Sequence, residues 1–313
     1  MSAAIPSAPS RLTHGPGVSP DAALREDGLP GEHLYLTALD GVLLQGRRWL
    51  PEQQGVRAAV VFMHGIASHG AWFSETAAVL AEHGVAVYAP DRRGSGLSGG
   101  PRGHILRYGQ AVSDAEQFLD LVAREHPGRP LFLIGSSWAA KPAVVIAARQ
   151  QDRLAGLIFH GPVLFPQVDL TLPEKLLVLA CHRSEPERPL PIPLRPELYT
   201  RNPAGVAYIE EDPYRLLTAS ARFFWETRRL DRARDRFTAE LRLPVLLLMG
   251  TDDAIADPTE TAVWITTLPS PDRKRLFYRG ASHTLDFEPE PIVSAYRADL
   301  LRWLEDRADR GGR

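Results

Sequence analysis

The chain has 313 residues, of which 44% are hydrophobic and 24% are charged, a composition typical of a globular protein with a large core. Its 36 Lys and Arg residues against 38 Asp and Glu residues give a formal net charge of -2. Because no overall basic field is available to hold a phosphate backbone, the composition argues against nucleic acid as a partner.

The N-terminal residues 1–31 are rich in Ala, Ser, Pro and Gly, and their apolar residues never gather into the core of a secretory signal. We interpret this segment as a mostly disordered leader. The single cysteine, Cys181, excludes an intrachain disulfide and a cysteine-based zinc cluster, and it suits a reducing compartment. We therefore expect a cytoplasmic protein. No apolar run approaches the roughly 18 residues that a membrane-spanning helix needs.

From Glu32 onward the sequence predicts regular secondary structure. Alternating apolar and polar residues on either side of 39–41 indicate a β-hairpin. Continuous apolar runs, typical of strands buried on both faces, then alternate with helical stretches. This alternation predicts an α/β fold, in which helices flank a mostly parallel sheet joined by right-handed crossovers. The runs lie at 58–63, 85–90, 131–134, 157–159, 245–249 and 275–278, and the helices at 72–83, 109–125, 141–151, 259–268 and 291–305.

Residues 161–243 interrupt this rhythm, because they contain ten prolines and no clear strand. We predict that they form a cap inserted into a core made of residues 32–160 and 244–313. Such an insertion is expected at the carboxyl ends of the strands, where open α/β sheets bind their ligands.

The segment Gly135-Ser136-Ser137-Trp138-Ala139 lies directly after a predicted strand and directly before a predicted helix. In a nucleophile elbow the strand turns so sharply into the helix that the residues two before and two after the nucleophile must be small. Gly135 and Ala139 meet this requirement, and the pattern predicts Ser137 as a nucleophile. The alternative is a serine that caps the following helix.

A catalytic serine needs a base and a carboxylate that orients the base, and in the elbow architecture the chain order is Ser, acid, His. His283, in the loop after the last predicted strand, is the expected base. His182 lies in the proline-rich insertion, where a solvated or packing role is expected instead.

Three aspartates, Asp252, Asp253 and Asp257, follow the predicted strand at 245–249. Asp257 precedes a proline and, three residues on, a glutamate, which is the signature of a helix start. Asp253 has cleared the strand end and can turn back toward His283, so we predict it as the acid, with Asp252 as the alternative.

The oxyanion formed by serine attack needs two backbone donors, one after the nucleophile and one from the loop after the third strand. These are the amides of Trp138 and Ile66. We expect Gly65 to adopt a positive φ that turns the Ile66 amide toward the site. His64, directly before this turn, is expected to support it rather than to act as a base.

With Ser137, Asp253, His283 and the His64-Gly65 turn, the chain resembles members of the α/β-hydrolase superfamily. More narrowly, it resembles the monoacylglycerol lipase and lysophospholipase branch, the serine aminopeptidase S33-like hydrolases. The resemblance covers about Glu32 to Glu305. It implies a mostly parallel sheet of about eight strands with a helical cap after the sixth, no cofactor, and Asp253 as the acid. The motifs that carry it are HGIASH at 64–69, DRRGSGLS at 91–98, RGH at 102–104, GTDDAIAD at 250–257, and TRNP at 200–203 with DP at 212–213 in the cap.

Cofactor and metal signals are weak elsewhere. The Gly94-x-Gly96-x-x-Gly99 spacing opens no convincing helix, which argues against a dinucleotide site. His64 and His69 lack a third ligand at a suitable spacing, so no metal is expected. The paired arginines of the Asp91-Arg92-Arg93-Gly94 turn are interpreted as a structural salt bridge in preference to an anion site.

The sequence thus predicts a serine hydrolase that cleaves a carboxylic ester, such as a monoacylglycerol or a lysophospholipid, through an acyl-enzyme on Ser137. A thioesterase, a lactonase, an acyltransferase and a ligand-binding protein on the same scaffold remain open. Apolar cap segments at 176–180 and 223–225 beside Arg188 and Arg195 fit either an acyl tunnel with a basic mouth or a solvated face. The cap could also bring the chain to a membrane surface, and the oligomeric state is left open.

Overall fold

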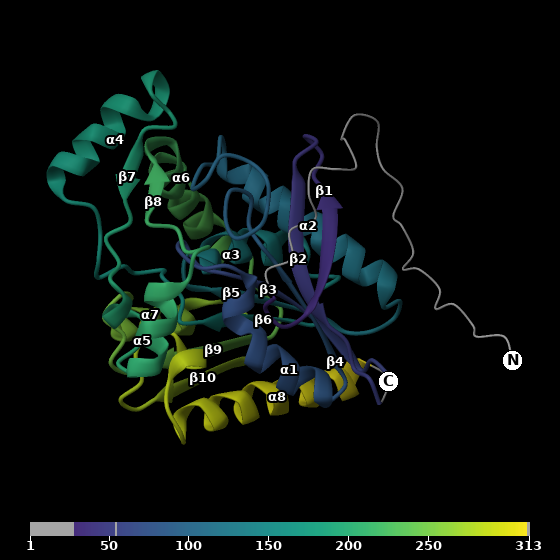
Figure 1. Cartoon of the computed structure of the whole chain (residues 1–313). Helices are drawn as coiled ribbons and strands as arrows, with labels where there is room; N and C mark the ends of the chain where they lie inside the picture. The colour runs from purple at the N-terminus through teal and green to yellow at the C-terminus, as the bar shows by residue number, and fades with distance from the viewer. Residues whose placement is uncertain (1–27, 54, 312–313) are drawn as a thin grey trace, which may run out of the picture.

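A sheet of eight strands forms the centre of the molecule (Figure 1). The computed structural model describes residues 28–53 and 55–311, so most of the expected leader lies outside the described residues. The strand order is β1-β2-β4-β3-β5-β6-β9-β10, and only β1 with β2 and β2 with β4 pair antiparallel. The predicted mostly parallel sheet is confirmed. The strands are β1 (Glu32–Thr37), β2 (Leu43–Trp49), β3 (Ala58–Met63), β4 (Val85–Pro90), β5 (Leu131–Ser136), β6 (Gly156–His160), β9 (Val245–Gly250) and β10 (Arg273–Tyr278).

Helices cover both faces of the sheet, because successive side chains of a strand point to opposite sides. In β3, Ala59 and Val61 belong to the core cluster beneath one helical layer, whereas Val60 and Phe62 belong to the cluster beneath the other. The first layer contains α2 (Tyr108–Glu125), α3 (Ala140–Arg149) and α7 (Pro258–Thr267), and the second contains α1 (Ser74–Glu82) and α8 (Ile292–Gly311).

The C-terminal helix α8 packs against the sheet through Trp303, which is fully buried. Its ring lies over Gly156, where a β-carbon would come within 2.4 Å of the Trp303 ring. The ring also contacts Phe132, at 5.7 Å between centroids. Glycine is therefore needed at position 156, because any side chain there would collide with the Trp303 ring. A closely packed interior has no room for a buried indole to move aside.

Between β6 and β9 the chain forms α4 (Leu172–Ser184), α5 (Pro203–Glu211), α6 (Ala221–Thr238) and two short strands, β7 (Pro189–Pro191) and β8 (Thr218–Ser220). The prediction that this stretch contains no strand is wrong, because β7 and β8 pair antiparallel. Prolines at both ends of β7 lack the backbone N–H groups that would donate hydrogen bonds to the neighbouring strand. The pairing is therefore only three residues long, and the sequence carries no clear strand pattern for it.

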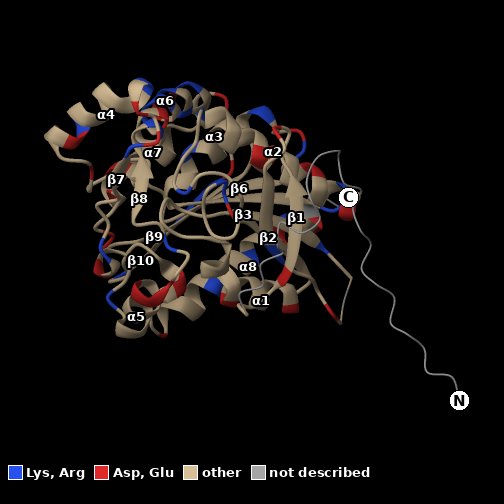
Figure 2. Cartoon of the chain, turned by 45° about the horizontal axis from the view of Figure 1, so that its top comes forward, with Lys and Arg blue, Asp and Glu red and all other residues tan. Residues whose placement is uncertain are grey.

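Charged side chains are distributed over much of the surface. Figure 2 shows basic and acidic residues interspersed along the helices, with several arginines on α6. Within the part of the chain that the structure describes, no helix combines the length and the apolar character needed to cross a membrane.

The contact between Gly156 and Trp303 gives a stability prediction. Gly156→Ala is expected to lower the free energy of unfolding by about 1–3 kcal/mol, because the added methyl overpacks the core. Gly109→Ala, in the first turn of α2 with no atom within 4 Å of the added β-carbon, is the matched control. It should leave stability unchanged or raise it by up to about 1 kcal/mol. Equal urea midpoints for the two variants would contradict this account.

Candidate active site

Ser137 sits at the turn from β5 into the short 3-10 helix η2 (Ser137–Ala139) that precedes α3. Its φ is 53°, and it is the one non-glycine residue with a positive φ in the described part of the chain. A β-carbon at Gly135 would lie 2.7 Å from that of Ala143, so the turn needs glycine two residues before the serine. Small residues thus allow a strained backbone that presents the Ser137 hydroxyl at the carboxyl edge of the sheet.

The structure brings together the three residues predicted as nucleophile, base and acid. The Ser137 Oγ lies 2.9 Å from His283 Nε2, and His283 Nδ1 lies 2.8 Å from Asp253 Oδ2. All three side chains are buried. The second carboxylate oxygen of Asp253 accepts hydrogen bonds from the amides of Ile255 and Ala256, at 2.8 and 2.9 Å. These bonds fix the carboxylate so that it accepts from Nδ1–H, which leaves Nε2 free to accept the serine proton.

The alternatives that the sequence left open occupy other positions. The Asp252 carboxylate is half-exposed and forms an ion pair with Arg201 at 2.9 Å. Asp257 caps α7 by accepting from two backbone amides, as its helix-start pattern predicts. His182 lies on α4 and stacks on Trp225 with 4.0 Å between ring centroids, which is a packing role within the insertion. None of these contacts involves His283.

The turn after β3 lies against the nucleophile. A β-carbon on Gly65 would come within 2.9 Å of the Ser137 β-carbon and 3.1 Å of its Oγ. The prediction of a positive φ at Gly65 is wrong, because this residue is absent from the positive-φ glycines of the described chain. Glycine is required here by the close approach of the backbone to Ser137, which excludes any side chain.

His64 and Arg92 hold the two carbonyl groups of this turn. His64 Nδ1 donates to the Gly65 oxygen at 2.9 Å, and His64 Nε2 accepts from the Arg92 amide at 2.8 Å. Burial, together with the nearby charge of Arg92, holds the pKa of His64 well below its usual value. The Arg92 guanidinium donates to the Ile66 oxygen at 2.9 Å. The turn is therefore supported by a neutral imidazole and a cation.

The guanidinium of Arg92 lies between two aromatic rings, 5.1 Å from the centroid of Trp138 and 4.9 Å from that of Phe223. Its Nε and Nη1 atoms are buried and have no hydrogen-bond partner among the described residues. Burial lowers the pKa of Arg92 to about 9, an effect that the charge of Arg102 reinforces and that of Asp91 opposes. The Arg92 cation thus contacts both Ile66 and Trp138, the two residues whose amides are the predicted oxyanion donors.

The two arginines of the Asp91-Arg92-Arg93 turn have different surroundings. Arg93 forms ion pairs with Asp114 at 2.6 Å and Asp40 at 2.7 Å, a structural role of the kind predicted, although both aspartates lie outside the turn. Sequence reasoning gave Arg92 the same role and missed its contact with the Ile66 carbonyl. No local pattern separates the two arginines, because the side-chain partners of both come from distant parts of the chain.

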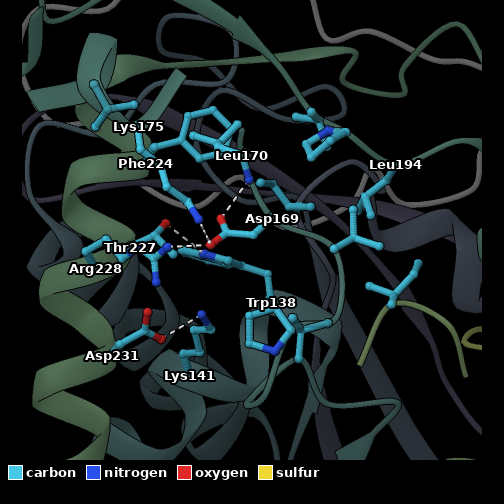
Figure 3. A pocket seen from close by; sticks show the side chains of 18 of the residues that line it. Trp138, Lys141, Asp169, Leu170, Lys175, Leu194, Phe224, Thr227, Arg228 and Asp231 are labelled. Atoms are coloured by element: carbon cyan, nitrogen blue, oxygen red, sulfur yellow. Dashed lines mark hydrogen bonds and ion pairs between the residues drawn. The ribbon is translucent and has the colours of Figure 1, made fainter. Parts of the chain in front are cut away.

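A cavity of about 340 Å³ opens beside Ser137 and runs beneath α4 and α6 (Figure 3). Much of its lining is apolar and includes Val163, Leu170, Val178, Ile192, Leu194 and Phe224. Its cations are Lys141, Lys175 and Arg228, whereas Arg188 and Arg195, considered from the sequence, are not among the lining residues that the structure describes.

Lys141 is a second residue that sequence reasoning missed. It is the one charged residue within 140–148, an otherwise apolar stretch of α3 that is buried throughout. The apolar run around Lys141 was a sequence signal that the lysine lies inside the protein. Among the described residues, no group of three or more His, Cys, Asp or Glu side chains is arranged to hold a metal ion.

Comparison with known proteins identifies the family. Residues 54–290 match the family described as serine aminopeptidase, S33. Human monoglyceride lipase is 26% identical over 282 residues, which cover 89% of this chain and 92% of the human protein. The monoacylglycerol lipase of Mycolicibacterium smegmatis is 25% identical over 277 residues, which cover 87% of this chain and 96% of that protein.

Solved structures share the fold. The crystal structure of Paleococcus ferrophilus monoacylglycerol lipase has a TM-score of 0.75 at 25% identity, and the match covers 84% of this chain and 99% of that chain. Monoglyceride lipase from Saccharomyces cerevisiae, in complex with a substrate analog, has a TM-score of 0.79 at 21% identity and covers 92% and 99%. With the family match extending over most of its length, the chain belongs to the serine aminopeptidase S33 family and has the α/β-hydrolase fold.

Proposed function

We propose that the protein hydrolyses a carboxylic ester of a medium or long acyl chain, such as a monoacylglycerol or a lysophospholipid, through an acyl-enzyme on Ser137. Its general activity is that of an ester-hydrolysing serine hydrolase of the lipase and esterase type. The observation that carries this proposal is the buried chain of hydrogen bonds from Ser137 through His283 to Asp253, together with the largely apolar cavity that Ser137 lines.

The proposed reaction uses His283 as the base and then as the acid. As the Ser137 Oγ attacks the ester carbonyl, its proton passes to His283 Nε2, and Asp253 stabilises the imidazolium through Nδ1–H. The imidazolium then protonates the departing alkoxide, which leaves an acyl-enzyme and a free alcohol. Water, deprotonated by the same Nε2, releases the carboxylic acid and restores the serine.

The tetrahedral oxyanion is proposed to accept hydrogen bonds from the amides of Ile66 and Trp138. The Ile66 N–H belongs to the same peptide group as the Gly65 carbonyl, which accepts from His64. A hydrogen bond to the oxygen of a peptide group polarises it and strengthens its N–H as a donor. Arg92, held against the Ile66 carbonyl and the Trp138 ring, fixes both donors and places a positive charge near the developing negative one.

The acyl group is proposed to lie in the cavity beside Ser137. Its volume of about 340 Å³ falls at the lower end of the roughly 300–1,000 Å³ of small-molecule pockets. Val163, Leu194 and Ile255 contribute to its apolar walls. The similar monoglyceride and monoacylglycerol lipases support an acyl ester as the substrate. The methylene groups of an acyl chain would contact these apolar walls.

The insertion is proposed to serve as a cap, residues 161–243, that contacts lipid. Leu172, Leu176 and Leu179 repeat at intervals of four and three residues along α4, and they are 70%, 58% and 56% exposed. Side chains at this spacing share one face of a helix. Exposed leucines on one helix face favour contact with the acyl region of a bilayer, from which an ester substrate would enter the cavity.

We also propose a cytoplasmic location. The single cysteine, Cys181, is buried and unpaired within α4, so the described chain contains no disulfide that would require an oxidising compartment.

The triad proposal is tested with a fluorophosphonate probe and peptide mapping. The parent should form a single adduct on Ser137 that Ser137→Ala abolishes. Asp253→Asn and His283→Ala should lower kcat by about 10³-fold or more, because the serine then lacks an oriented base. Asp252→Asn is the matched control and should remain close to the parent, since Asp252 pairs with Arg201. A folded parent that neither reacts with the probe nor hydrolyses an ester would favour the ligand-binding alternative.

A second prediction concerns Arg92. Arg92→Met is expected to lower kcat about 10- to 100-fold with little change in KM, a smaller loss than that of a direct oxyanion donor. Arg92→Lys, which retains the charge, should recover part of the loss. Arg93→Met breaks a buried ion pair instead, so it should lower the melting temperature more than kcat. If kcat in Arg92→Met matches the parent, the cation does not support the oxyanion.

The membrane proposal is tested with Leu172→Ser/Leu176→Ser, because neither leucine lines the cavity. Its partition into phosphatidylcholine vesicles should fall at least about tenfold, since burying one leucine is worth about 1.5–3 kcal/mol. Hydrolysis of a soluble short-chain ester should be retained. Leu39→Ser, at the tip of the β1–β2 hairpin and 85% exposed, is the matched control and should bind vesicles like the parent. Unchanged binding by the α4 variant would exclude this surface.

A further inference from the structure

A buried lysine lies in the wall of the proposed acyl cavity (Figure 3). Lys141 follows Ser137 by four residues, about one helical turn, and is only 4% exposed. Its Nζ lies 2.6 Å from a carboxylate oxygen of Asp231, on α6. Lysine is rarely buried, because removing an ammonium from water costs several kcal/mol unless partners compensate. A purely apolar acyl chain would gain nothing from this group.

The Lys141 ammonium can donate more hydrogen bonds than its one ion-pair partner accepts. An ammonium carries three N–H groups, and the described residues supply one ion-pair partner, Asp231. Burial lowers the pKa of Lys141, an effect that Asp231 opposes. A second acceptor in the cavity would therefore stabilise the charged form of the lysine.

A second group of charges, which is more exposed, lines the same cavity. Asp169 pairs with Lys175 at 2.9 Å and with Arg228 at 2.5 Å. These side chains are 38–51% exposed, so they are partly solvated, unlike Lys141. Arg228 and Asp231 are three residues apart on α6 and thus share one face of that helix. In Figure 3 the charged side chains gather on the side of α3 and α6, and Leu194 lies opposite them.

The charges on this wall do not balance. Lys141, Lys175 and Arg228 are three cations, whereas Asp169 and Asp231 are two carboxylates, so the lining carries a formal surplus of one positive charge. One further carboxylate would make the set neutral. Charge-assisted bonds from lysine or arginine to a carboxylate are the strong ones in a site of reduced solvent access.

We propose that the cavity selects acyl groups that carry a carboxylate toward their far end, with Lys141 and Arg228 binding that carboxylate. The preferred substrates are then half-esters of linear dicarboxylic acids, in which Ser137 attacks the ester and the free acid lies against α3 and α6. This inference rests on the proposed function, since it concerns the acyl half of the same ester. It leaves the alcohol half as proposed above.

The test compares ester pairs of equal chain length. The 4-methylumbelliferyl half-esters of six- and eight-carbon dicarboxylic acids are compared with the hexanoate and octanoate esters. In the parent, kcat/KM for at least one half-ester should equal or exceed that of the alkanoate. In Lys141→Met, which keeps the length of the side chain and removes its charge, the ratio of half-ester to alkanoate should fall at least about tenfold.

Two further variants separate substrate binding from structural support. Lys141→Met leaves Asp231 without its partner, so Lys141→Met/Asp231→Asn restores neutrality and should show the same loss of preference. Lys274→Met, in β10 and outside the cavity, is the matched control and should keep the parent ratio. If the ion pair only joins α3 to α6, the melting temperature falls while the ratio of the two esters stays at the parent value, and the inference is overturned.

The outcome also distinguishes this inference from the proposed function. A parent that hydrolyses the alkanoates and forms the Ser137 adduct, but prefers them to both half-esters by tenfold or more, would retain the proposed function and exclude the carboxylate site. A parent without adduct and without turnover of either ester class would overturn both.

Discussion

The left-handed backbone of Ser137 is the constraint on which the site depends. A side chain at φ 53° is tolerated only where the neighbouring backbone leaves room, and Gly135 provides this room against Ala143. The same turn brings Ser137 within van der Waals reach of Gly65, so residue 65 in the loop that carries the proposed second oxyanion donor must also lack a side chain. The strained turn is thereby packed on both sides, and its hydroxyl lies within hydrogen-bond distance of His283.

Around this turn the insertion and the core together bury two cations, Arg92 and Lys141. Helix α6 supplies Phe223, whose ring covers Arg92, and Asp231, which pairs with Lys141. Each cation is therefore desolvated partly by the core and partly by the insertion. Charges in such surroundings interact more strongly than in water, which is the physical basis for proposing that Arg92 supports the oxyanion and that Lys141 binds a substrate carboxylate.

The sequence alone predicted much of the architecture and part of the site. The apolar runs predicted strands and the elbow pattern placed Ser137, because both depend on local sterics. The loop position favoured Asp253 as the acid but left Asp252 open, since only the folded loop shows which carboxylate accepts hydrogen bonds from the Ile255 and Ala256 amides while facing His283. Gly65 was identified for the wrong reason. Its role is close packing, which a turn pattern does not encode.

What the sequence determined by itself is the set of local features: the order of strands and helices outside 161–243, the strand-turn-helix around Ser137, and the helix cap at Asp257. These arise from interactions between residues a few positions apart. The tertiary structure alone decided which arginine reaches the Ile66 carbonyl, how Lys141 meets Asp231 across 90 residues, and which cations line the cavity. Such contacts join segments whose separation along the chain leaves no periodic trace, so only the packed fold specifies them.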